Sequence, residues 1–321
     1  MKNLPAILLL LALPCLPARA QDRYAGMGGF LGPVSDSAAY LFTAAPAQRG
    51  GAQILRQEAE GTRVLSKSPS DTWSVSGQAG LIRLGAPLAI PVTGTRVPEK
   101  LWNVQAGGAF ARRLAQRRAW GASLGAGSAS DEPFRSIHET TARATVYGEW
   151  PSRERDSWLL FLNYSNNRSF LNNVPLPGAA YVFREPAPGL RAIIGLPFVS
   201  LDYRPTEGWR ASLSVIGPTN ASAEVSRRLR SEAWAYARYA RDPSQWSLAG
   251  RTTRSDRLIF DRQEARAGLR LPLGAGLSAD LSAGREFGRR FFEGRDAQHS
   301  DGPKAELPAA WTGALRLSWR R

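Results

Sequence analysis

The sequence has few of the residues on which metal and redox chemistry depend. Cys15 is the only cysteine among 321 residues, and it lies in an N-terminal segment that we expect to be removed. The remaining chain then has no thiol for a disulfide or a metal ion. Only two histidines occur, His138 and His299, far apart in the sequence. We therefore expect no metal and no cofactor.

Long apolar runs are also missing once the first twenty residues are set aside. No later stretch approaches the roughly 20 apolar residues that a membrane-spanning helix needs. Apolar residues at the spacing of an amphipathic helix are equally scarce. The sequence excludes a helical membrane protein, but not a transmembrane β-barrel, because only alternate residues of its strands face lipid.

The first twenty residues have the form of a secretory signal peptide. Lys2 precedes an apolar stretch from Ala6 to Leu13, and Ala18-Arg19-Ala20 matches a small-residue cleavage site. We expect residues 1–20 to be cleaved after Ala20 on export. Residues 21–50 show no sustained period and are expected to be a leader or a first, poorly patterned strand. The folded domain would then occupy residues 51–321.

Lysine is scarce as well, since 38 of the 42 basic residues are arginine. The net charge of +15 falls to +13 when Lys2 and Arg19 leave with the signal peptide. Such a charge favours anionic partners, and arginine binds phosphate in a bidentate way, which suggests lipopolysaccharide. A codon bias toward arginine is an equally good explanation. Nucleic acid is not expected, since no nucleic-acid-binding motif occurs and an exported chain rarely meets it.

What the sequence has instead is alternation. From residue 311 to 319 the odd positions are Trp, Gly, Leu, Leu and Trp, and the even positions are Thr, Ala, Arg and Ser. Period-two alternation is typical of a strand with one apolar and one polar face. Similar runs occupy 73–81, 102–110, 142–150, 209–215, 265–271 and 277–283, with weaker ones at 53–65, 119–127, 157–165, 191–204, 221–229, 233–241 and 245–253. We predict an all-β fold, an antiparallel up-and-down transmembrane β-barrel of about 12 strands within a range of 10–14.

Two features favour a membrane barrel over a soluble sandwich. The apolar faces are rich in alanine and glycine, which fill a protein core poorly. Tryptophans fall near strand ends, where the aromatic girdle of a membrane barrel lies. The residues predicted to face lipid or to form the girdle are Trp73, Trp102, Trp150, Trp209, Trp311, Leu315, Leu317 and Trp319.

The opposite faces carry charges of both signs. In a lumen, carboxylates paired with arginines form ladders that satisfy buried charge. Anion selection is the alternative role for such arginines. The predicted lumen residues are Arg143, Glu149, Arg210, Glu264, Arg266, Arg270, Asp280 and Arg316.

Residues 159–209 contain several distinctive motifs, namely NYSNNR (163–168), PLPGAAY (175–181), GLPF (195–198) and YRP (203–205). With DRL at 256–258 and RRFFEG at 289–294, they resemble a family of bacterial outer-membrane β-barrels known only as a domain of unknown function. The resemblance implies the outer membrane of a Gram-negative envelope and the barrel fold, and it supplies no activity. The composition of NYSNNR and PLPG is also typical of turns and bends, with a bound ion or sugar at the asparagines as the alternative. The residues concerned are Asn163, Asn166, Asn167, Pro175, Pro177, Gly178 and Tyr181.

No convincing catalytic group emerges from the sequence. Barrel lipid hydrolases place a histidine and a serine on one strand face. Ser300 follows His299 directly, so the two would point apart, and His138 has only Thr140 at the required spacing.

We therefore expect an outer-membrane barrel with a passive pore, transport or structural surface role, and no enzyme. The alternatives are an outer-membrane lipid or lipopolysaccharide hydrolase and a soluble periplasmic β-sandwich binding protein. The expected partners are outer-membrane lipid and lipopolysaccharide, the barrel-assembly machinery and periplasmic chaperones during biogenesis, and small solutes.

Overall fold

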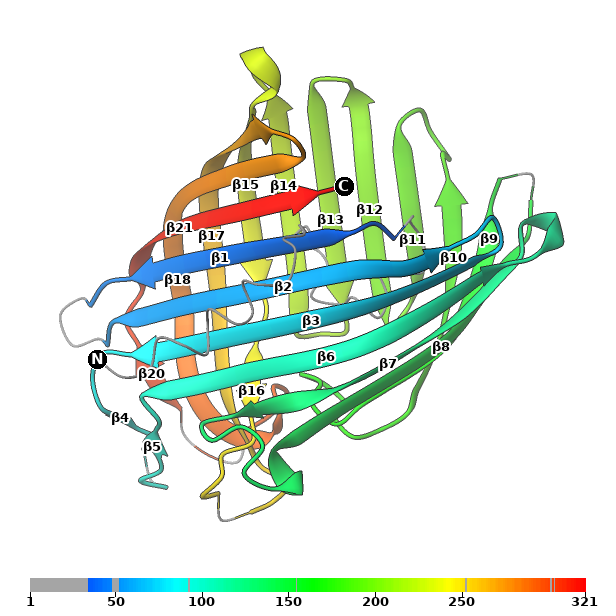
Figure 1. Ribbon diagram of the computed structural model, residues 1–321. Helices are drawn as coiled ribbons and strands as arrows, with labels where there is room; N and C mark the ends of the chain where they lie inside the picture. The colour runs from blue at the N-terminus through cyan, green and yellow to red at the C-terminus, as the bar shows by residue number, and fades with distance from the viewer. Residues whose placement is uncertain are drawn as a thin grey trace.

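The described part of the chain folds into one closed β-barrel (Figure 1). The computed structural model describes residues 34–47, 52–91, 93–153, 155–251, 253–300, 302 and 304–321. The predicted signal peptide lies outside these residues. No helix within these ranges is both long and apolar enough to cross a membrane.

Sixteen antiparallel strands make up the wall, which confirms the all-β barrel class. They are β1 (Ser37–Ala45), β2 (Ile54–Lys67), β3 (Asp71–Leu84), β6 (Lys100–Arg113), β7 (Ala119–Ser130), β8 (Thr140–Pro151), β9 (Ser157–Ser165), β10 (Leu176–Arg184), β11 (Leu190–Leu196), β12 (Phe198–Thr206), β13 (Trp209–Ile216), β14 (Asn220–Arg228), β15 (Trp234–Arg241), β17 (Arg257–Gly274), β18 (Leu277–Asp296) and β21 (Ala310–Arg320). The described connections hold the short strands β4 (Leu88–Ala89), β5 (Arg96–Val97), β16 (Ser244–Trp246), β19 (His299–Ser300) and β20 (Ala305–Leu307), and the 3-10 helices η2 (Ala115–Arg117), η3 (Ile137–Glu139) and η4 (Arg230–Glu232).

The barrel closes where β1 pairs with β21. The ladder runs from Ser37 opposite Arg320 to Ala44 opposite Gly313, and the other edge of β1 pairs with β2. The barrel thus begins within residues 21–50, and the predicted boundary at residue 51 is wrong. Alanine stands on both faces of β1, whose sequence is SAAYLFTAA, so the strand shows no clear period.

The predicted count of about 12 strands is too low for a similar reason. Residues 191–204 were expected to be one strand, but they form parts of β11 and β12, separated only by Pro197. β10 occupies the proline-rich stretch that was expected to bend. The strand predicted at 245–253 is wrong beyond Trp246, where β16 ends and the chain folds across the barrel mouth. Short strands joined by very short connections give too few alternations to be counted from the sequence.

The two ends of the barrel differ in their connections. At the end where β1 begins and β21 finishes, strands are joined by two to five residues, for example 68–70, 207–208 and 275–276. We call this the turn end. At the opposite end, the loop end, the longest connections are 85–99, 242–256 and 297–309. Short turns at one end and long loops at the other are typical of outer-membrane barrels, whose turns face the periplasm.

The cross-strand register assigns the two faces of the wall. Leu160 and Leu281 lie on its outer face with about half of their surface exposed, at 47% and 51%. Charged and small polar side chains alternate with them on the inner face, as Glu264 opposite Glu286 and Arg270 opposite Asp280 illustrate. An outer face this apolar is unfavourable in water and suits a hydrocarbon environment.

The outer aromatic residues gather at the turn end. Trp73 contacts Phe110 with ring centroids 4.5 Å apart, and Phe110 contacts Trp120 at 5.1 Å. Trp158 and Tyr181 form an edge-to-face pair at 4.9 Å. On the outward register of the strand ends at the turn end lie six of the ten tryptophans of the chain: Trp73, Trp120, Trp150, Trp158, Trp209 and Trp319. Trp102 and Trp311 lie outward at the loop end, while Leu315 and Leu317 lie between the two ends of β21.

An apolar layer fills much of the loop end. It joins the inward side chains of strand ends in β2, β3, β6, β17 and β18 to loop residues that fold across the mouth. Ile90 and Val97 come from the β4–β5 hairpin, and Trp246 and Leu248 come from residues 242–256. We call this group the loop-end layer. It lies across one side of the barrel mouth at the loop end.

A second apolar cluster lies on the inner face of β8 to β12. It contains Phe161 and Phe198, whose ring centroids are 5.6 Å apart. Gly178 faces the same cluster, and a Cβ there would lie 1.9 Å from the Phe161 ring. The bend predicted at PLPG is therefore wrong. Its glycine lies within β10 because an aromatic ring occupies the space of a side chain.

Candidate functional site

A charged cluster occupies the inner wall where β2 faces β17 and β18. Glu264 and Glu286 are cross-strand neighbours, and Glu286 is completely buried. Arg266 contacts Glu264 at 3.0 Å, and Arg56 hydrogen-bonds to Glu286. The cluster contains four arginines and two glutamates: Arg56, Arg262, Glu264, Arg266, Glu286 and Arg289. Such burial of charge is tolerated because the partners are close, and it leaves a positive excess in the lumen.

Small residues on β21 make this contact possible. Arg56 belongs to β2, and β1 and β21 separate it from Glu286 in β18. The inward positions of β21 beside the cluster are Ala310, Thr312 and Ala314, all buried. Short side chains there leave room for the guanidinium group to reach across two strands.

Further ion pairs continue toward the turn end. Arg316 contacts Glu60 at 2.8 Å, and Arg270 contacts Asp280 at 3.3 Å and Glu224 at 3.5 Å. The Tyr236 hydroxyl donates to Asp280 at 2.5 Å. The result is a ladder of paired charges, of the kind that satisfies charge inside a barrel.

All eight predicted lumen residues lie on the inward register, but not in one place. Glu264, Arg266, Arg270, Asp280 and Arg316 belong to the cluster and ladder. Glu149 lies near the turn end, bound by Arg184 and by Ser157, and Arg210 stacks on Trp234 at 4.3 Å. Arg143 lines a cavity nearer the loop end. The sequence analysis missed Arg56 and Glu60, which lie in a weakly patterned run.

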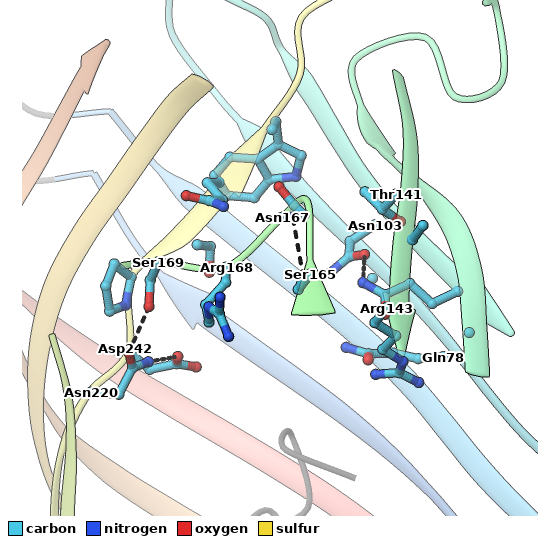
Figure 2. A pocket seen from close by; sticks show the side chains of 18 of the residues that line it. Gln78, Asn103, Thr141, Arg143, Ser165, Asn167, Arg168, Ser169, Asn220 and Asp242 are labelled. Carbon is cyan, nitrogen blue, oxygen red and sulfur yellow. Dashed lines mark hydrogen bonds between the residues drawn. The ribbon is translucent and has the colours of Figure 1, made fainter. Parts of the chain in front are cut away.

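That cavity lies in the lumen close to the loop end and has a volume of about 230 Å³. Its wall is formed by polar side chains of the first strands and of β8, including Gln78, Asn103 and Arg143 (Figure 2). Two inward loops complete it, residues 166–175 and 242–256. The charged side chains that line it are Glu58, Arg143, Arg168 and Asp242.

The asparagine motif shapes this cavity. Asn163 lies within β9, donates to Thr145 at 2.8 Å and accepts from Arg168 at 2.6 Å. The Arg168 guanidinium also donates to three backbone carbonyls of its own loop, and burial lowers its pKa from the usual value. Arg168 therefore fixes the loop. Asn166 and Asn167 lie in this loop, whereas the turn expected at Asn163 is strand.

The remaining motif residues divide in the same way. Pro175 ends this loop, while Pro177, Gly178 and Tyr181 lie within β10. The segment therefore forms one loop and two strands around the cavity.

The inward loop 242–256 is tied to residues 131–139. Arg251 donates to the His138 carbonyl at 2.8 Å and contacts Glu139 at 3.4 Å, with both side chains less than a tenth exposed. Asp131 accepts from the Ala249 amide at 2.9 Å. Burial alone would raise the pKa of the Glu139 carboxyl, but hydrogen bonds at Ser136 and the Arg251 charge hold it below the usual value. We call the Arg251–Glu139 contact the latch.

A wider opening, about 880 Å³, lies at the turn end. We call it the vestibule. Eight basic and three acidic residues line it: Lys67, Arg113, Arg117, Arg118, Arg155, Arg184, Arg191 and Arg204, against Glu149, Glu185 and Asp202. Arg112 also borders it, but its side chain lies on the outer face, where it pairs with Asp71 and packs over Phe110. Its potential is therefore strongly positive.

The two histidines lie apart, in loops. His138 belongs to η3 and is exposed, and His299 is exposed beside Asp296, 2.8 Å from its carboxylate. Within the ranges that the structure describes, no group of three or more His, Cys, Asp or Glu is arranged to hold a metal ion.

The chain matches no protein-family model and no curated protein sequence. Among solved structures it is similar to an outer-membrane channel from Pseudomonas putida F1, with 7% identity over 90% of this chain and 96% of that chain and a TM-score of 0.33. It is also similar to the toluene transporter TodX of Pseudomonas putida, with 8% identity over 90% of each chain and a TM-score of 0.36. OmpT, an outer membrane protein of Vibrio cholerae, has 6% identity over 90% of this chain and 99% of that chain, with a TM-score of 0.33. The neighbours are outer-membrane barrels, the class that the motifs of residues 159–209 imply, and at such identities none assigns this chain to a family.

Proposed function

We propose that this protein is an outer-membrane barrel that passes small anionic solutes through a lumen gated at its loop end. The observation that carries the proposal is the excess of arginine along the inside of the barrel, from the vestibule to the charged cluster. A lumen lined by basic side chains favours anions over cations.

The outer surface supports the membrane part of the proposal. Large apolar side chains cover it, and tryptophans ring it at the turn end. Interfacial tryptophans mark the level of the lipid headgroups. In this proposal the turn end faces the periplasm and the loop end the exterior, after cleavage following Ala20 and insertion by the barrel-assembly machinery. Lipopolysaccharide would surround the loop end.

The loop end supports gating over permanent opening. Trp246 and Leu248 lie in the loop-end layer, and the latch holds their segment against residues 131–139. Passage of a solute therefore requires this segment to move. Closing movements of loops that act as lids occur on microsecond to millisecond timescales.

Conductance in planar bilayers tests the proposal. In a salt gradient of potassium chloride, the reversal potential should show chloride preferred over potassium. Replacing Arg113 and Arg118 of the vestibule by glutamine should reduce this preference. The matched control is Arg227→Gln, because Arg227 lies outside the barrel on Trp209. No current, or a preference for potassium, would refute the proposal.

The hydrolase alternative has its own measurement. Replacing His138 and His299 together by alanine should leave the conductance unchanged, because both side chains are exposed in loops away from the cavity wall. Lipid hydrolysis by the purified protein that this double variant loses would favour an enzyme instead.

A further inference from the structure

Two neighbouring side chains in the cavity are buried without polar partners. Gln245 is 7% exposed, and neither its amide nitrogen nor its amide oxygen bonds any residue that the structure describes. Trp246 is 3% exposed, and its indole nitrogen is equally without a described partner. Both line the cavity. Leaving such groups unbonded is unfavourable, so a bound polar molecule would stabilise this arrangement.

The opposite wall presents a cation. Arg143 extends from β8 across Gly125, where a Cβ would lie 2.6 Å from its Nε. It forms no ion pair with a described residue, unlike the arginines of the charged cluster, and it lines the same cavity (Figure 2). The glycine is needed because the guanidinium lies over the backbone of β7.

The asparagine motif supplies one more unpartnered polar group to the cavity. Asn167 lies in the inward loop, its backbone N–H donates to the Ser165 hydroxyl at 3.1 Å, and its side-chain oxygen has no described partner. The cavity therefore offers donors from Arg143, Gln245 and Trp246, and acceptors from Gln245 and Asn167. A carboxylate complements Arg143, and hydroxyl groups, which both donate and accept, complement the others.

The size of the cavity and the charges that line it narrow the class of ligand further. A volume of about 230 Å³ is below the roughly 300 Å³ at which pockets for drug-sized ligands begin. Glu58 and Asp242 also line the cavity, and they would repel a doubly charged anion such as phosphate. A small molecule with one carboxylate and several hydroxyl groups satisfies both conditions.

We infer that this cavity is a binding site for a small hydroxylated monocarboxylate, held between Arg143 on the wall and Gln245 and Trp246 on the inward loop. The inference rests on the proposed function, since it names the class of anion that the lumen would carry. Because Gln245 and Trp246 belong to the segment that the latch holds, the occupied site would also favour the closed loop.

Calorimetric titration of the purified barrel in detergent tests the site. Glucuronate is the probe, with glucose and inorganic phosphate for comparison. Glucuronate should bind at least about tenfold more tightly than either, because only it supplies one carboxylate together with hydroxyl groups. Equal affinity for glucose, tighter binding of phosphate, or no binding of glucuronate would each overturn the inference.

Two variants locate the binding. Arg143→Gln, which removes the positive charge, should weaken glucuronate binding by about tenfold or more. Gln245→Leu, which removes the amide, should weaken it by several-fold. Arg210→Gln is the matched control, because Arg210 is an inward arginine that does not line the cavity. Equal losses in all three variants would refute the site. Heat-modifiable migration on a denaturing gel verifies folding, and Gln245→Leu alone decides if Arg143→Gln fails to fold.

The result is separable from the proposed function. Chloride-selective current without glucuronate binding would remove the site and leave the anion channel. Binding without any current would keep the site and remove the channel.

Discussion

Replacing Arg251 by alanine removes the side chain that ties the inward loop 242–256 to residues 131–139. Arg251 donates to Leu248 at 2.7 Å and to His138 at 2.8 Å, and it pairs with Glu139 at 3.4 Å. Breaking a buried ion pair costs about 3–5 kcal/mol. Glu139 keeps its bond from the Ser136 amide at 2.6 Å, so the lower value, about 3 kcal/mol, applies.

A change of this size shifts the ratio of closed to open loop by about 100-fold. Single-channel recording should therefore show a comparable rise in open probability for Arg251→Ala. Arg135→Ala is the control. The Arg135–Glu132 pair also lies in the loop 131–139, but both of its side chains are more than half exposed, and such pairs contribute less than about 1 kcal/mol to stability. Equal open probabilities in the two variants would show that the latch does not hold the gate.

Three further predictions concern pH, packing and closure. The Ser136 bonds to Glu139 remain when the loop opens, so only the part of the lowered Glu139 pKa that comes from the Arg251 charge depends on closure. For that part the latch should stabilise the closed state above about pH 4.3 and lose the effect as the pH falls further; open probability should rise in acid, and Glu139→Gln should abolish this dependence. Gly178→Val should lower the free energy of unfolding in urea by about 1–3 kcal/mol, because its side chain would overlap Phe161, whereas Gly313→Ala, with nothing within 4 Å, should change it little; equal effects would contradict the packing described for β10. Deleting residues 320–321 removes the backbone bond from Arg321 to Asp36 at the barrel seam and the one from Arg320 to Gly276 in the β17–β18 turn, and it should reduce the yield of heat-modifiable barrel from cells; an unchanged yield would show that barrel closure does not need them.

The fold could be predicted where large outward side chains alternate with polar inward ones. β8 and β21 have this pattern, and their predicted ranges agree with the structure. β1 has alanine on both faces, and β10 carries Pro177 and Gly178, so neither has a visible period. Sequence alternation reports the contrast between faces, and strands without that contrast are missed.

The candidate site could be predicted only in part, for a geometrical reason. Alternation places Glu264 and Arg266 on one face of a strand, but it does not identify Arg56, which is more than 200 residues distant and meets them through closure of the barrel. Gln245 and Trp246 lie in a run that was expected to continue as a strand. Their burial depends on the chain turning inward, which no local pattern indicates.

The uneven distribution of tryptophan has a consequence for how the protein would sit in membranes of different thickness. Six tryptophans lie outward at the turn end and would anchor it at one interface, whereas only Trp102 and Trp311 lie outward at the loop end. A change in bilayer thickness would therefore be absorbed almost entirely at the loop end. The vestibule would keep its depth, while the headgroups of the outer leaflet would move along the strands that carry the loop-end layer. Lipid thickness would then act on the gate and leave the entrance at the turn end unchanged.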